Sequence, residues 1–163
     1  EMSASLVGSE MCIRDRNKEL AVLTQLFQET LLRVNSRDYT PQQIEAWGRK
    51  ADKSRWEELF ASSLQFMVAE TEDQKIVGFT SINSQGYLHS MFVDYRYQRQ
   101  GIARLLLTKA EEYARRYGAT VLSAEVSITA LPFFEKQGFC LKRENKVSFE
   151  NTTMINYTME KQL

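Results

Sequence analysis

The fold is decided by the apolar run Tyr87-Leu88-His89-Ser90-Met91-Phe92-Val93, a short polar loop, and the segment Gln98-Arg99-Gln100-Gly101-Ile102-Ala103. The apolar run predicts a strand, and the residues after Gly101 predict an amphipathic helix. Apolar side chains recur there at the spacing of one helix face, namely Ile102, Leu105, Leu106, Ala110, Tyr113, Ala114 and Tyr117. Because the first turn of a helix has unpaired N–H groups and partial positive charge, we expect residues 99–103 to bind an anion.

The segments on either side predict a mixed sheet with helices on both faces. Thr40, Pro41 and Gln43 form a helix-start pattern, with an N-cap hydroxyl, a proline at the first helical position and a capping-box partner. Periodicity predicts helices over 18–33, 41–49, 54–60 and 127–137, and strands over 65–70, 76–82, 120–126, 139–147 and 152–160. This order predicts a single-domain α/β fold, with a mostly antiparallel sheet and one parallel β-α-β crossover.

Composition limits the function classes that fit this chain. Its 163 residues are 43% hydrophobic and 26% charged, as expected for one globular domain with a sizeable core. The 21 basic and 21 acidic residues balance, so composition favours neither a nucleic-acid nor a membrane partner. Cys12 and Cys140 fit a reduced compartment, no apolar run approaches a membrane span, and one histidine with two distant cysteines predicts no metal site. We therefore expect a soluble, cytoplasmic protein.

Residues 1–13 look foreign to the domain that follows. They begin with Glu, lack the basic start and apolar centre of a signal peptide, and are expected to be a non-native or disordered lead that replaced part of a first strand. The domain is expected to span residues 14–163. It contains neither a Gly-x-Ser-x-Gly elbow nor the Gly-Lys-Ser/Thr ending of a nucleotide-hydrolase loop.

The segment Gln98-Arg99-Gln100-Gly101-Ile102-Ala103 resembles the signature of the GNAT superfamily of acetyl-CoA-dependent N-acetyltransferases. That signature is Arg or Gln, two residues, Gly, one residue, then Gly or Ala. Its position between a strand and an amphipathic helix strengthens the resemblance, and Ala130-Leu131-Pro132-Phe133-Phe134-Glu135-Lys136-Gln137-Gly138-Phe139 resembles the closing helix and Gly-Phe turn of the family. The resemblance extends from about Arg14 to Leu163, and residues 35–47 are similar to a poorly characterised bacterial branch.

The resemblance implies a binding site for acetyl-CoA. The pyrophosphate would lie on the N–H groups of Arg99 to Ala103. Unpaired backbone groups of Met91 and Val93 would bind the pantetheine arm between two strands that diverge. The implied cofactor-binding residues are Met91, Phe92, Val93, Gln98, Arg99, Gln100, Gly101, Ile102, Ala103, Arg104, Phe133 and Phe134. Arg104 could equally belong to a solvated helix face.

The resemblance also implies direct attack of a primary amine on the thioester in a ternary complex. His89 is the candidate general base, unless it only makes a hydrogen bond at a strand edge or points into solvent. Glu125 is the second candidate, or else a surface carboxylate. The family's usual acid is a tyrosine, replaced here by Phe134. Tyr87, Ser127 or Tyr157 could act instead, or the thiolate, with a pKa of about 8.5, could leave unassisted; Ser127 is also a candidate helix N-cap.

Several alternatives stay open at this stage. Trp47, Trp56 and Phe60 form either core or the wall of an acceptor pocket. The acceptor is expected to be a small-molecule amine or a peptide, and a homodimer is compatible with the sequence. The loss of the usual tyrosine at Phe134 also fits a non-catalytic module that binds coenzyme A. A third alternative is a transferase that acts on protein N-termini or lysines.

Overall fold

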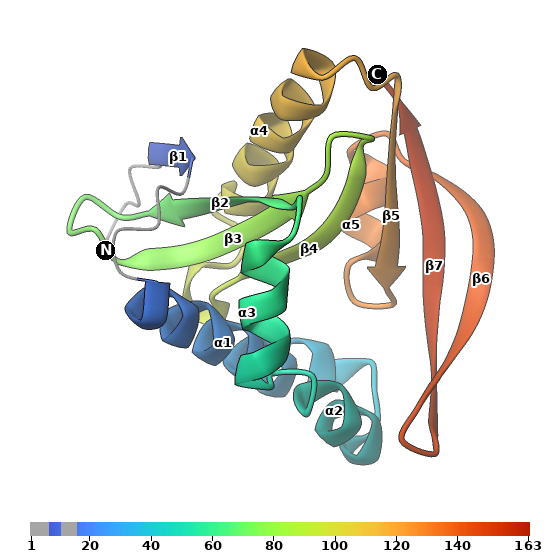
Figure 1. Ribbon diagram of the computed structural model, residues 1–163. Coiled ribbons are helices and arrows are strands. Elements are labelled where there is room, and N and C mark those ends of the chain that lie inside the picture. Colours follow the sequence, from blue (N-terminus) through green and yellow to red (C-terminus); the bar gives the residue numbers. More distant parts are fainter. Residues whose placement is uncertain (1–6, 11–15) are drawn as a thin grey trace.

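The computed structural model describes residues 7–10 and 16–163, which form a seven-stranded sheet with helices on both sides (Figure 1). The sheet has the order β1-β2-β3-β4-β5-β7-β6. Its strands are β1 (Val7–Glu10), β2 (Gln65–Glu70), β3 (Ile76–Ile82), β4 (Tyr87–Val93), β5 (Val121–Ser127), β6 (Cys140–Phe149) and β7 (Thr152–Gln162). Only β4 and β5 run parallel, and every other neighbouring pair is antiparallel. The predicted mixed α/β fold is confirmed.

Three helices cover one face of the sheet: α1 (Arg16–Arg33), α2 (Pro41–Gly48) and α3 (Lys53–Ala61). The capping box at the start of α2 is confirmed, because Thr40 Oγ1 accepts from Gln43 N at 3.1 Å and Gln43 Oε1 accepts from Thr40 N at 2.9 Å. Phe27 of α1 and Trp56 of α3 pack against Phe79 of β3. Trp56 is therefore a core residue, as one alternative predicted, whereas the side chain of Phe60 lies outside the described part.

Helix α4 (Ile102–Arg116) covers the opposite face. Its buried residues are Ile102, Leu106, Leu107, Ala110 and Ala114. The sequence pattern omitted Leu107 from the inner face, although its side chain is only 2% exposed. It also wrongly placed Tyr117 on that face, although Tyr117 is 58% exposed. Tyr117 is the C-cap residue, so it follows the last turn that packs on the sheet.

The last helix is shorter than predicted. Helix α5 covers only Leu131–Lys136, and residues 128–130 form a turn between it and β5. The helix N-cap residue is Ala130, so the prediction of Ser127 in that position is wrong. Ser127 Oγ instead accepts from Ala130 N at 3.1 Å and caps the turn. Pro132 limits the helix, because a proline fits only near a helix start.

The first strand falls within residues 1–13, which the sequence predicted to be a foreign or disordered lead. Val7–Glu10 forms β1 and pairs antiparallel with β2 at the edge of the sheet. The other residues of the expected foreign lead, including Cys12, lie outside the described residues. Cys140 is a free, exposed cysteine. Within residues 7–10 and 16–163, no helix combines the length and apolar character needed to cross a membrane.

Strands β4 and β5 diverge soon after they meet. Their parallel pairing is limited to Tyr87 with Ser123 and Leu88 with Ala124. On the other edge of β4, Ser81 pairs with Ser90 but Ile82 pairs with Leu88, which leaves His89 as the extra residue of a β-bulge. A bulge bends its strand and breaks the alternation of side chains. The sheet therefore opens beside His89.

Candidate active site

A cavity of about 690 Å³ lies where β4 and β5 diverge. Its wall includes β4, the end of β5 and the start of α4. It also includes residues from α1 to α3, which cover the face of the sheet opposite α4. The predicted site residues that line it are Tyr87, His89, Met91, Phe92, Val93, Gln98, Arg99, Gly101, Ile102, Ala103, Arg104, Glu125, Ser127, Phe133 and Phe134. Among the predicted residues, Gln100 and Tyr157 are not part of this wall.

The loop before α4 leaves the helix start accessible. Gly101 is the N-cap residue with φ of +83°, and Arg99 also has a positive φ of +60°. A glycine cannot cap the helix with a side chain, and a Cβ built on Gly101 would meet nothing within 4 Å. Because N–H groups of the first helical turn lack intrahelical partners, this loop presents donors and positive charge to the cavity.

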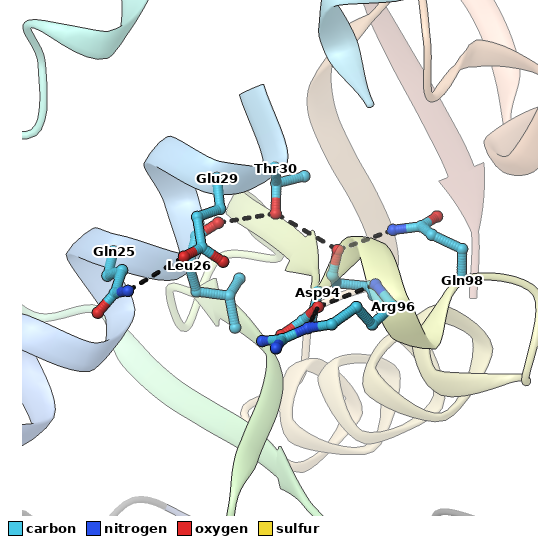
Figure 2. A network of polar contacts seen from close by, with 8 residues as sticks. Gln25, Leu26, Glu29, Thr30, Asp94, Arg96 and Gln98 are labelled. Atoms are coloured by element: carbon cyan, nitrogen blue, oxygen red, sulfur yellow. Dashed lines mark hydrogen bonds and ion pairs between the residues drawn. The ribbon is translucent and has the colours of Figure 1, made fainter. Parts of the chain in front are cut away.

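Side chains from α1 and from the loop meet at the end of β4 (Figure 2). Gln98 Nε2 donates to Val93 O at 2.7 Å, and Thr30 Oγ1 lies 3.4 Å from the same oxygen while it donates to Leu26 O at 2.7 Å. The expectation that the backbone groups of Val93 are unpaired is therefore wrong for its carbonyl. Gln98, the first residue of the signature, attaches the loop to the strand.

The backbone of β4 still presents groups to the opening. Asp94 N donates to Val77 O at 2.8 Å, so Asp94 faces β3. Backbone groups in an antiparallel ladder point alternately to the two sides. Phe92 therefore faces β3, whereas Met91 and Val93 turn their backbone groups toward β5 and the cavity.

An ion pair stabilises the turn that follows β4. Asp94 is buried and accepts from Arg96 N at 2.9 Å and from Arg96 Nη2 at 2.9 Å (Figure 2). Burial opposes ionisation of this carboxyl, but the hydrogen bonds and charge of Arg96 lower the pKa of Asp94 below its ordinary value. In the turn that leads into the signature loop, Asp94 is therefore bonded to both the backbone and the side chain of Arg96.

His89 is half-buried and faces the cavity from the bulge. Its Nδ1 lies 3.5 Å from Ser81 Oγ, which is itself hydrogen-bonded to Ser90 Oγ. Burial, followed by the positive charges of Arg55 and Lys50, lowers the pKa of His89 below its ordinary value. The imidazole is consequently neutral near pH 7, the form that accepts a proton.

The other candidate catalytic groups differ in their surroundings. Glu125 is exposed, and its Oε2 accepts from Asn145 Nδ2 at 3.0 Å and Thr158 Oγ1 at 3.1 Å. Burial, and then the charge of Glu125, raise the pKa of Tyr87, so its phenol is protonated at neutral pH and can donate. Phe134 is a buried residue whose ring packs edge-on against Phe139, with centroids 5.0 Å apart.

Sequence reasoning missed several polar residues of the cavity wall, among them Lys50, Arg55 and Thr129. Lys50 follows α2, Arg55 lies in α3, and neither belongs to a motif, so no sequence signal placed them opposite β4. The buried Thr129 Oγ1 has no hydrogen-bond partner within the described part of the chain. Trp47 and Trp56 also line the cavity, which makes Trp56 both a core residue and a wall residue.

Comparisons with known proteins agree with this architecture. Residues 35–161 match the model of the acetyltransferase (GNAT) domain. The chain is 36% identical over 137 residues to the uncharacterized N-acetyltransferase YafP of Escherichia coli strain K12, which covers 84% of this chain and 85% of the relative.

Solved structures show the same fold. The GCN5-related N-acetyltransferase from Rhodopseudomonas palustris is 25% identical with a TM-score of 0.86, over 99% of this chain and 96% of that one. The PaiA N-acetyltransferase from Thermoplasma acidophilum was solved in complex with coenzyme A. It is 20% identical with a TM-score of 0.77, over 98% of this chain and 99% of that one. The chain therefore belongs to the GNAT family of acetyltransferases and is an acyltransferase.

Proposed function

We propose that this protein transfers the acetyl group of acetyl-CoA to a primary amine by direct attack in a ternary complex. The observation that carries the proposal is one continuous cavity that contains both the uncapped start of α4 and the neutral His89 at the β4 bulge. The likeness to a fold solved with coenzyme A in the Thermoplasma protein supports the choice of cofactor.

The cofactor would bind along β4 toward α4. The N–H groups of residues 99–103 would bind the pyrophosphate, with the Arg99 and Arg104 side chains close enough to neutralise its charge. The pantetheine arm would lie beside β4 like an added strand and bond the outward-facing backbone of Met91 and the N–H of Val93. This places the thioester in the opening beside His89.

The chemistry then needs positioning and two proton transfers, one from the amine and one to the leaving thiolate. The amine nitrogen attacks the thioester carbonyl, forming a C–N bond, and the C–S bond breaks as the electron pair leaves with sulfur. His89 accepts the proton of the amine, directly or through water. Tyr87 or solvent supplies a proton to the thiolate, which is a good leaving group because a thiol has a pKa of about 8.5. The products are an acetamide and free coenzyme A.

Calorimetric titration with coenzyme A, combined with an assay for free-thiol release from acetyl-CoA, tests this proposal. We expect cofactor binding, and thiol release that depends on an added primary amine and yields the acetamide by mass spectrometry. Binding without turnover across a broad panel of amines would contradict it and would favour the non-catalytic module instead.

A further inference from the structure

Two cationic side chains line the cavity outside the signature loop. Lys50 lies in the turn between α2 and α3, and Arg55 belongs to α3, so both come from the helical segment that covers the face opposite α4. Arg99 and Arg104, by contrast, lie at the α4 end where the pyrophosphate would bind. The cavity therefore has positive charge at two separate places, and the cofactor phosphates account for only one.

Neither Lys50 nor Arg55 forms an ion pair with a carboxylate among the described residues. The neighbouring Arg49 differs, because it pairs with both Glu45 and Glu150. The Lys50 Nζ atom lies 4.8 Å from the centre of the Phe149 ring. Burial, and then the charge of Arg55, lower the pKa of Lys50. Lys50 is half-buried, and a half-buried cation without a counterion is unfavourable, so an anion in the cavity would stabilise Lys50; Arg55 is exposed and would add a second positive charge for the same anion.

The position of the two cations relative to His89 indicates which ligand brings that anion. Arg55 and Lys50 line the same cavity as His89 but belong to α3 and the segment before it, not to the loop that would bind the pyrophosphate, and their charges act on His89. Trp47 and Leu59 add apolar surface to the same wall. A molecule with its amine beside His89 would thus extend along apolar side chains toward the two cations.

We propose that the acceptor is an amine that also carries an anionic oxygen group, and that Lys50 and Arg55 bind this group. The inference rests on the proposed acetyl transfer, and it names the class of acceptor. A carboxylate and a phosphate share the required chemistry, because both present two or more oxygens to the Arg55 guanidinium and the Lys50 ammonium.

Three probes with the same aromatic body separate the possibilities: para-aminomethylbenzoate, para-aminomethylphenylphosphonate and the neutral para-methylbenzylamine. Thiol release measured with each gives kcat and KM. We expect either anionic probe to exceed the neutral one about tenfold in kcat/KM, the value of one charge-assisted hydrogen bond. The better of the two anionic probes identifies carboxylate or phosphate as the preferred group.

Variants assign the effect to the two cations. Lys50→Gln and Arg55→Gln should each raise KM for the anionic probe about tenfold, leave KM for the neutral amine unchanged, and leave the Kd for coenzyme A unchanged. Arg115→Gln, on the exposed side of α4, is the matched control and should change none of these values. A weaker Kd for coenzyme A in the Lys50 or Arg55 variant would assign the cations to the cofactor and overturn the inference.

Failure of this inference is distinguishable from failure of the proposed function. If amines are acetylated but the neutral probe performs as well as the anionic ones, the transfer stands and the acceptor class is wrong. If no amine is acetylated, the proposed function fails. In that case the same three probes are titrated into the coenzyme A-loaded protein. Tighter binding of an anionic probe than of the neutral one supports the acceptor class. Equal affinities for the three probes, or no binding of the anionic probes, overturn the inference about the acceptor.

Discussion

At the scale of single residues, two features support the proposed role of His89 as the general base. The bulge removes its pairing partner on β3, which turns the imidazole into the cavity. Burial and the charges of Arg55 and Lys50 disfavour its protonated form. His89 therefore loses its capacity to accept a proton only when the pH falls through a pKa that lies below the ordinary value of about 6.5.

A pH profile of kcat/KM tests the role of His89. We expect an acidic limb below about pH 6.5 in the wild-type protein, and a flattened limb with a loss of about a hundredfold in rate for His89→Ala. Arg55→Gln removes a nearby positive charge, so the pKa of His89 rises and the limb moves to higher pH. Arg115→Gln should leave the limb in place, and an unaltered profile in His89→Ala would exclude this residue as the base.

Gly101 offers a second test at this scale, with an internal control. Gly101 and Gly118 both have φ of +83°, and a Cβ at either position would meet nothing within 4 Å. A leucine at either site costs about 1 kcal/mol of backbone strain. Only Gly101→Leu would fill the cavity at the start of α4, so its Kd for coenzyme A should rise about tenfold or more, equivalent to about 1.4 kcal/mol. Calorimetry that finds equal Kd values for the two variants would reject the loop assignment.

At the scale of elements, the site depends on how the loop between β4 and α4 is attached. Thr30 of α1 and Gln98 of the loop both contact Val93 O (Figure 2). The Asp94–Arg96 pair stabilises the intervening turn. The carbonyl of Val93 therefore joins three elements: the end of β4, helix α1 on one face of the sheet, and the loop that leads into α4 on the other face.

Gln98→Met tests this attachment, because methionine has a similar length but no N–H donor. Without the hydrogen bond, worth about 1 kcal/mol, the loop must be ordered when the cofactor binds. The Kd for coenzyme A should rise about fivefold. Gln25→Met removes a comparable bond, from Gln25 Nε2 to Glu29, on the exposed side of α1 and serves as control. Equal affinities of the two variants would show that Gln98 does not position the loop.

At the scale of the whole molecule, Tyr39 joins the N-terminal helices to the C-terminal strands. Its hydroxyl donates to Ile155 O of β7 at 2.9 Å and accepts from Ile128 N, just after β5, at 2.9 Å. The side chain is buried, and this burial raises its pKa. The wall formed by α2 is thereby joined to the end of β5, where the sheet opens.

Tyr39→Phe should lower the free energy of unfolding by about 2 kcal/mol, because it leaves a backbone N–H and a backbone carbonyl without their partner. Chemical denaturation measures this change. Tyr117→Phe removes a hydroxyl from an exposed side chain and should change stability by less than about 0.5 kcal/mol. A Tyr39→Phe variant as stable as the control would show that the bridge contributes nothing.

Local patterns predicted the elements of the fold because their causes are local. The capping box of α2 needs only Thr40 and Gln43, and the apolar spacing after Gly101 reports which side of α4 meets the sheet. The errors occurred where an element ends or where the chain departs from a regular period. Tyr117 follows the last turn of α4, and α5 begins four residues later than predicted, at Leu131 rather than at Ser127.

By itself, the sequence determined the fold class and the loop that opens α4, and most of the site residues it predicted line the cavity, because each rests on neighbours along the chain. Only the tertiary structure decided that His89 is a bulge residue and that Gln98 bonds Val93 O. The tertiary structure alone also placed Lys50 and Arg55 in the cavity wall with the residues of β4. These features depend on strand register and on packing between distant segments, and periodicity within one element contains no information about either.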